Sequence, residues 1–177
     1  MTYRTWDIET TISAHFKRKA KPYDPANWTV THGYKAKGEA TVVETRFGNE
    51  RPPSGWLKPV LKDIMLLIGM NIKFDLSHAL QDAENLEAWM DYVVKGGQVW
   101  DIQLAEYLLC GMGQKDQMLS LDEIAPRYGG NVKIDEVKAL WNAGINTQDI
   151  EPALLSRYLC GGLDENGVWQ KGDVENT

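Results

Sequence analysis

A continuous apolar run, IMLLIGM at residues 64–70, constrains the fold of this chain more than any other segment. A run of this kind is typical of a strand that is buried on both faces of a sheet. From Asp75 onward the spacing of apolar residues is mainly helical, with breaks at the glycine pairs 96–97, 129–130 and 161–162. Strands come first, then a stretch in which strands and helices alternate, and then helices, and this order predicts an α/β fold with a central mixed sheet.

The same patterns give the expected boundaries of the elements. We expect one domain over residues 1–177, because a chain of this length can bury a core. Lys37 and Gly38 are expected to join two strands as a hairpin. The predicted strands are 2–9, 28–38, 40–48, 64–70 and 98–101. The predicted helices are 53–63, 75–82, 85–95, 101–110, 120–128, 134–142 and 151–160.

Composition excludes few classes of protein. The net charge of −6 argues mildly against a protein that coats nucleic acid through bulk electrostatics, but a carboxylate site that holds cations would itself add negative charge. Cys110 and Cys160 lack metal-type spacing and are interpreted as reduced thiols in the core. No apolar run approaches the length of a membrane span, and the amino end does not resemble a signal peptide. We therefore expect a cytoplasmic protein without a membrane partner.

The candidate chemistry lies in carboxylates, because the chain has no G-x-x-x-x-G-K, G-x-G-x-x-G, G-x-S-x-G or H-E-x-x-H motif. Asp7 and Glu9 in TWDIET are two positions apart on a predicted strand, so both side chains lie on one face, about 7 Å apart. Such a pair is repulsive unless a cation lies between the two groups, and a divalent ion with oxygen ligands is the simplest candidate. A solvent-facing strand would also tolerate the pair, so both interpretations stay open at this point.

A second element is NIKFD at 71–75, where the apolar strand ends and a helix is expected to begin near Asp75. A carboxylate there lies at the mouth of the sheet, where sites in α/β folds gather. Asp75 can equally serve as a helix cap. Asp101 is expected to cap the helix that follows it, and His78 is expected on a helix surface.

Together these motifs resemble a known family. Asp7-x-Glu9 in a first strand followed by NIKFD is similar to the first two motifs of the DEDD superfamily of 3′–5′ exonucleases. The likeness covers nearly the whole chain and is strongest to the proofreading exonuclease domain of family-A DNA polymerases, particularly the phage-encoded branch. The further segments that carry it are VWDIQLAEYLL (99–109), LSLDEIAPRYGG (119–130), DIEPALLSRYL (149–159) and GDVENT (172–177).

The resemblance implies a ribonuclease-H-like fold, a mixed central sheet flanked by helices, and hydrolysis of a terminal phosphodiester. It implies that two Mg²⁺ ions, for which Mn²⁺ can substitute, are held by Asp7, Glu9, Asp75 and Asp173. The superfamily uses either a tyrosine or a histidine to orient the attacking water. No histidine follows His78, so Tyr158 is expected in that role. Asn71 and Phe74 are expected to bind the terminal nucleotide of the substrate.

The tail departs from the family pattern, in which the tyrosine and the last aspartate lie one helical turn apart. Here Tyr158 and Asp173 are fifteen positions apart. We therefore expect residues 162–172 to be an inserted hairpin or loop, with Asp173 as the metal ligand and Asp164 exposed in a turn. The helix that begins at Asp173 is expected to be short and frayed, and the metal affinity to be low.

The expected partner is the 3′ end of single-stranded or frayed DNA, and a DNA polymerase chain or domain is a second expected partner. Residues 15–21 are basic and either contact the incoming backbone or form a solvated loop. Nothing after Thr177 corresponds to a polymerase, so we expect either part of a longer chain or a separately encoded exonuclease, which a phage would place in the cytoplasm of its bacterial host. The alternatives are a catalytically weak DNA-binding or polymerase-docking module of the same fold, and a 3′–5′ exoribonuclease.

Overall fold

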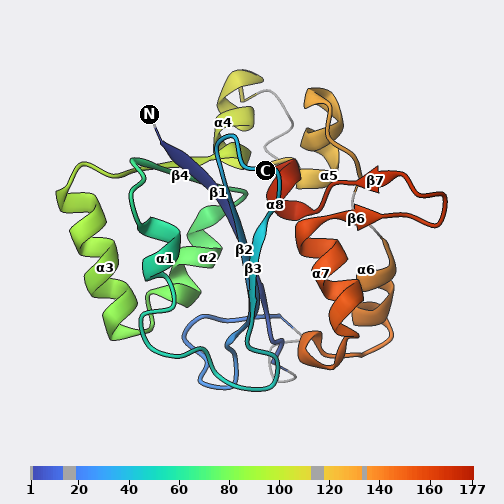
Figure 1. Cartoon of the computed structure of the whole chain (residues 1–177), viewed down its shortest axis with the longest axis horizontal. Coiled ribbons are helices and arrows are strands. Elements are labelled where there is room, and N and C mark those ends of the chain that lie inside the picture. The colour runs from blue at the N-terminus through green and yellow to red at the C-terminus, as the bar shows by residue number, and fades with distance from the viewer. Residues whose placement is uncertain (1, 14–18, 113–117, 133–134) are drawn as a thin grey trace.

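A mixed five-stranded sheet forms the centre of the protein (Figure 1). The computed structural model describes residues 2–13, 19–112, 118–132 and 135–177. The strands lie in the spatial order β3-β2-β1-β4-β5. Their bounds are β1 (Tyr3–Thr10), β2 (Thr29–Ala36), β3 (Val43–Arg46), β4 (Leu66–Gly69) and β5 (Gln98–Asp101).

The central strand is β1, which pairs with a neighbour on each side. It runs antiparallel to β2, with Asp7 opposite Gly33, and parallel to β4, with Thr5 opposite Ile68. β4 in turn runs parallel to β5, and β2 runs antiparallel to β3. A strand held in this way by ladders of backbone hydrogen bonds is a rigid base for side chains.

Helices cover both faces of the sheet (Figure 1). In the view of Figure 1 the sheet is seen nearly edge-on, with α1, α2 and α3 on one side and α6, α7 and α8 on the other. The α-helices are α1 (Lys58–Leu61), α2 (Ile72–Ala79), α3 (Ala83–Val94), α4 (Ile102–Leu109), α5 (Leu121–Ile124), α6 (Asp135–Asn142), α7 (Pro152–Cys160) and α8 (Asp173–Asn176). The 3₁₀ helices are η2 (Ala125–Tyr128) and η3 (Thr147–Asp149).

Two apolar clusters separate these layers. The first contains Trp6 and Ile8 of β1, which pack with residues of α1 and α2 such as Val60 and Ile72. The second contains Val30 of β2 with Leu155 and other residues from the opposite helices. Because side chains alternate along a strand, burial of Trp6 and Ile8 on one face directs their neighbours in β1 to the other face. The apolar face of β1 therefore anchors the strand in the core, and its polar face is available for a functional site.

The α/β fold with a mixed sheet is confirmed, with several differences in boundaries. Helix α2 begins at Ile72, before the predicted start, because Asn71 adopts a left-handed conformation with φ of 49° and turns the chain out of β4. The predicted helix 120–128 divides into α5 and η2, since Pro126 cannot donate the hydrogen bond that would continue the α-helix. The connection at Lys37-Gly38 is longer than predicted, because β3 begins only at Val43.

The segment after α7 folds back on itself before α8. β6 (Gly162–Leu163) pairs antiparallel with β7 (Trp169–Gln170), so a small hairpin lies within the predicted range 162–172. Its status as an insertion stays a prediction. In the described part of the chain no helix is long and apolar enough to cross a membrane.

Candidate metal centre

The first two carboxylates of the site come from β1. Asp7 is half-buried and Glu9 is buried, and both lie on the face of the strand that turns away from Trp6 and Ile8. Gly33 lies directly opposite Asp7 in β2. Since Gly33 has no side chain, the space above this part of the sheet is open to another element.

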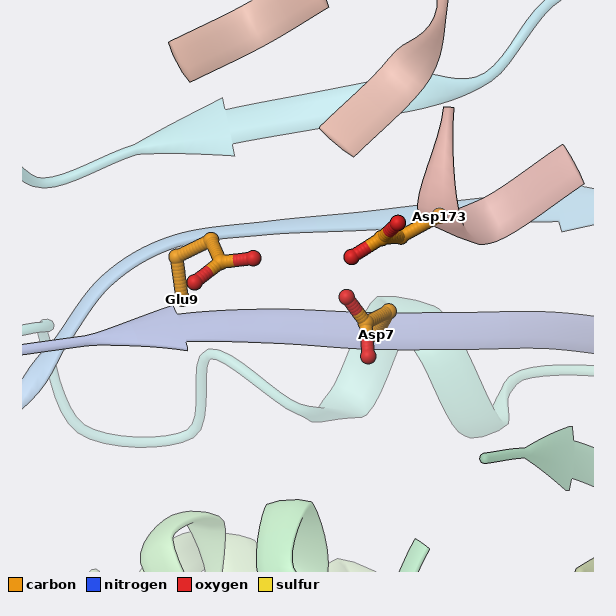
Figure 2. Close-up of side chains that lie close together, drawn as sticks. All are labelled: Asp7, Glu9 and Asp173. Carbon is orange, nitrogen blue, oxygen red and sulfur yellow. The ribbon is translucent and has the colours of Figure 1, made fainter. Parts of the chain in front are cut away.

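That element is α8, which delivers Asp173. Val174 is fully buried, and a Cβ atom built on Gly33 would lie 3.1 Å from the Val174 Cγ2 atom, so α8 rests directly on β2. Asp173 is 2% exposed. Carboxylate oxygens of Asp7, Glu9 and Asp173 lie within 4.8 Å of one another. Figure 2 shows the three side chains converging in the space between β1 and α8.

A fourth carboxylate, Asp75, is buried in the first turn of α2. Burial raises the pKa of Asp75 well above its ordinary value, and the negative charges of Asp7, Glu9, Asp101 and Asp173 raise that pKa further. The Asp75 Oδ2 atom is buried and has no hydrogen-bond partner among the described residues. Asp75 is outside the group of three that lies within 4.8 Å. The negative charge of each member of that group nevertheless raises the pKa of Asp75.

The position of Asp75 depends on a fixed turn between β4 and α2. Asn71, the first residue of that turn, donates its backbone N–H to the Asp101 Oδ1 atom at 3.1 Å. The same Oδ1 atom accepts hydrogen bonds from the backbone N–H groups of Gln103 and Leu104, which confirms Asp101 as the cap of α4. Asp101 thereby joins the ends of two parallel strands at the mouth of the sheet.

Phe74 and His78 lie on the same helix as Asp75. Phe74 is half-buried, and its ring centroid lies 4.5 Å from that of His78. The prediction that His78 lies on a helix surface is wrong, because His78 is 9% exposed and its Nδ1 atom lies 3.1 Å from the Phe74 carbonyl oxygen. The reason is that His78 faces the segments that carry Trp28 and Trp56, which line the same cavity.

Tyr158 and Asp164 are the remaining predicted residues of the tail. Tyr158 is buried in the second apolar cluster, where its ring packs edge-on against Trp141 with centroids 5.7 Å apart. Its catalytic role stays a prediction. The Asp164 Oδ1 atom accepts hydrogen bonds from the backbone N–H groups of Asn166 and Val168, so Asp164 closes the hairpin turn. Asp164 lies in a turn as predicted, but it is half-buried and not exposed, because its carboxylate is hydrogen-bonded within that turn.

Three groups beside the site were missed from the sequence. Glu44 of β3 accepts hydrogen bonds from the hydroxyls of Thr31 at 2.9 Å and Ser156 at 2.5 Å. Burial raises the pKa of the Cys160 thiol to about 12, and the charges of Glu44, Glu175 and Asp7 contribute to that rise. The prediction that both cysteines lie in the core is wrong for Cys110, which is exposed. The third group, Glu175, lies two residues after Asp173. The strand register, which the sequence alone does not give, would have been needed to find Glu44.

The basic stretch 15–21 lies largely outside the described residues, which resume at Lys19. Lys19 and Lys21 are both exposed. Its expected contact with a nucleic-acid backbone therefore stays a prediction.

No family model matches the chain, and no curated protein matches it. The fold and the site together define an α/β protein with a largely buried acidic cluster that could hold a metal ion.

Proposed function

We propose that the protein is a metal-dependent 3′–5′ exonuclease that hydrolyses the terminal phosphodiester of single-stranded or frayed DNA, in a proofreading role. The observation that supports this proposal best is the convergence of Asp7, Glu9 and Asp173 within 4.8 Å, although the last residue is remote in sequence from the first two. A third, buried carboxylate is not expected beside two carboxylates that merely face solvent, because like charges repel. The convergence therefore favours a cation site over the interpretation of Asp7 and Glu9 as a solvent-facing pair.

The fold supports the same proposal at a coarser level. A five-stranded mixed sheet in the order β3-β2-β1-β4-β5, with helices on both faces, is compatible with a ribonuclease-H-like fold. Within it, the candidate ligands come from the central strand, from the helix after the neighbouring strand β4, and from α8. This distribution agrees with the order of motifs in the exonuclease superfamily that the sequence resembles.

The residues present fit divalent metal ions. All the candidate ligands are carboxylate oxygens, which suit Mg²⁺ and Mn²⁺. The buried Asp75 Oδ2 atom lacks a partner among the described residues, and its neighbours are negative, so the site is short of positive charge. We propose that Asp7, Glu9, Asp75 and Asp173 hold two such ions. Bound there, the ions would neutralise charge on the attacking and leaving oxygens of a phosphodiester.

The remaining residues act on the substrate and on water in this proposal. Asn71 is exposed at the end of β4, where its side chain is accessible to a nucleotide. Phe74 presents a ring that is backed by His78 and can pack against a base. Tyr158 would orient the attacking water through its hydroxyl group.

A nuclease assay with matched aspartate variants tests the proposal. A 3′-labelled single-stranded DNA oligomer should lose its terminal nucleotide in Mg²⁺ and stay intact in EDTA. Asp7→Asn and Asp173→Asn should each lower the rate by more than about a hundredfold, beyond the effect typical of residues that only support metal ligands. Asp164→Asn, which removes the negative charge but keeps the side-chain oxygen that closes the hairpin turn, should cleave at the wild-type rate.

Two outcomes would favour the alternatives. Binding of the oligomer without release of nucleotides would indicate a docking module. Faster hydrolysis of an RNA oligomer of the same sequence would indicate an exoribonuclease.

A further inference from the structure

The helix that carries Asp173 is too short to be stable by itself. α8 has four residues, Asp173–Asn176, and a helix of one turn does not form in water without tertiary contacts. The orientation of the Asp173 carboxylate must therefore be determined by what the rest of α8 contacts. These contacts identify the residues that set the geometry of the metal centre.

The start of α8 is held by a close approach of two glycines. A Cβ atom on Gly172 would lie 2.3 Å from the Gly161 backbone nitrogen and 2.5 Å from the Leu159 carbonyl oxygen. Gly172 is thus pressed against the end of α7, and only glycine fits there. This contact fixes the position of the chain immediately before Asp173, but not the direction in which α8 leaves it.

The direction of α8 is fixed by Glu175, whose two carboxylate oxygens are bound by residues of two different strands. The Glu175 Oε1 atom lies 2.6 Å from the Lys35 Nζ atom in β2. The Glu175 Oε2 atom accepts a hydrogen bond from the indole N–H of Trp169 at 2.9 Å. The side chains of Glu175 and Lys35 are 10% and 22% exposed, so this charge-assisted pair is partly shielded from water. A carboxylate held at both oxygens cannot rotate without losing one of these bonds.

Trp169 links this contact to the hairpin. It lies in β7 and is 53% exposed, so its ring contributes little to the core. Its indole N–H nevertheless reaches α8. The hairpin is otherwise closed on itself by the β6–β7 pairing and by Asp164.

We propose that Glu175 is a positioning residue for the metal centre and that the β6–β7 hairpin, through Trp169, orients α8 so that Asp173 faces Asp7 and Glu9. This inference rests on the metal binding that is part of the proposed function, but not on nuclease activity. Lys35 offsets the charge of Glu175, so the contact adds little repulsion to a site that already holds four carboxylates. The hairpin within residues 162–172, which separates Tyr158 from Asp173, would thereby have a role in the metal site.

Direct measurement of Mn²⁺ binding tests the proposal, because it does not depend on catalysis. Free Mn²⁺ is measured by electron paramagnetic resonance during titration of the full chain, and melting temperatures are measured in EDTA. Trp169→Phe should weaken Mn²⁺ binding about tenfold, the lower end of the range for residues that support metal ligands, with an unchanged melting temperature. Glu175→Ala should weaken it further, and Glu175→Gln, which keeps an acceptor for Trp169, should recover part of the loss.

The matched control is Glu84→Gln, because Glu84 also pairs with a lysine, Lys58, but on the other face of the sheet. It should bind Mn²⁺ like the wild type. Wild-type affinity in both Trp169→Phe and Glu175→Ala would overturn the proposal. A loss of Mn²⁺ affinity that parallels a fall in melting temperature across the variants would also overturn it, because the contact would then stabilise the fold without positioning Asp173. Mn²⁺ binding by a wild type that releases no nucleotides would refute the nuclease and leave this inference standing.

Discussion

β1 and α8 supply carboxylates to the same site by opposite means. In β1, Asp7 and Glu9 share a face because side chains alternate along a strand, and the strand is held by β2 and β4 on its two sides. In α8, Asp173 has one turn of helix behind it and depends on residues from β2, α7 and β7. The β1 half of the site is therefore set locally, whereas the α8 half is set by contacts remote in sequence. Substitutions that leave Asp7 and Glu9 in place but displace α8 should therefore still weaken metal binding.

The largest effect is expected where the two halves touch, at Gly33. A Cβ atom there would lie 3.1 Å from both Val174 Cγ2 and Val42 Cγ1. Gly33→Val should push α8 away from β2 while leaving Asp7 and Glu9 in place, and we expect Mn²⁺ binding to weaken by about a hundredfold, the upper end of the range for supporting residues. Gly33→Ala should show a smaller loss. Wild-type Mn²⁺ affinity in Gly33→Val would mean that metal binding does not require α8 to pack closely on β2 at Gly33.

A smaller, pH-dependent effect is expected at Asp75. Burial, together with the charge of Asp7, raises the pKa of Asp75 in the folded protein. Below the ordinary pKa of an aspartate, about 3.9, both folded and unfolded states carry the proton and no stability depends on it. Above that pH the unfolded state releases the proton while the folded state keeps it, so the metal-free protein loses stability as the pH rises toward the raised pKa.

Replacement of this group should reverse that loss. In EDTA, Asp75→Asn should melt several degrees above the wild type at pH 7, and the difference should shrink toward pH 4. Thermal unfolding followed by circular dichroism at a series of pH values measures it. A lower melting temperature for Asp75→Asn at pH 7 would contradict the interpretation of Asp75 as a strained, buried acid.

The smallest effect is expected in the rate at which Cys160 is alkylated, which reports on how closely α8 packs against the end of α7. Burial raises the pKa of this thiol to about 12, so at pH 8 only about one molecule in ten thousand carries the reactive thiolate. In a Cys110→Ser background, iodoacetamide should therefore label Cys160 slowly, and Gly33→Val should increase the rate several-fold. Equal rates with and without Gly33→Val would show that α8 does not shield the end of α7.

The contrast between β1 and α8 also explains which features the sequence could predict. The local pattern predicted that Asp7 and Glu9 share one face of a strand and that Asp75 lies at the mouth of the sheet. Their grouping in one metal site was implied only by the family resemblance. The roles of Gly33 and Glu175 depend on strand register and on contacts between distant segments, which no local pattern encodes. His78 was misplaced for the same reason, because the cover over α2 comes from segments far away in the sequence.

The separation of Asp7 from Asp173 also has a consequence for the order of events during synthesis. A span of 166 positions lies between these two residues. At about 5–20 residues per second, a ribosome needs roughly 8–33 s to add that span. β1, β2 and β4 can pair during this interval, but the acidic cluster stays incomplete until the last of its members emerges. Whatever chemistry the cluster performs is therefore withheld from the nascent chain and begins only after nearly all of the described protein has been made.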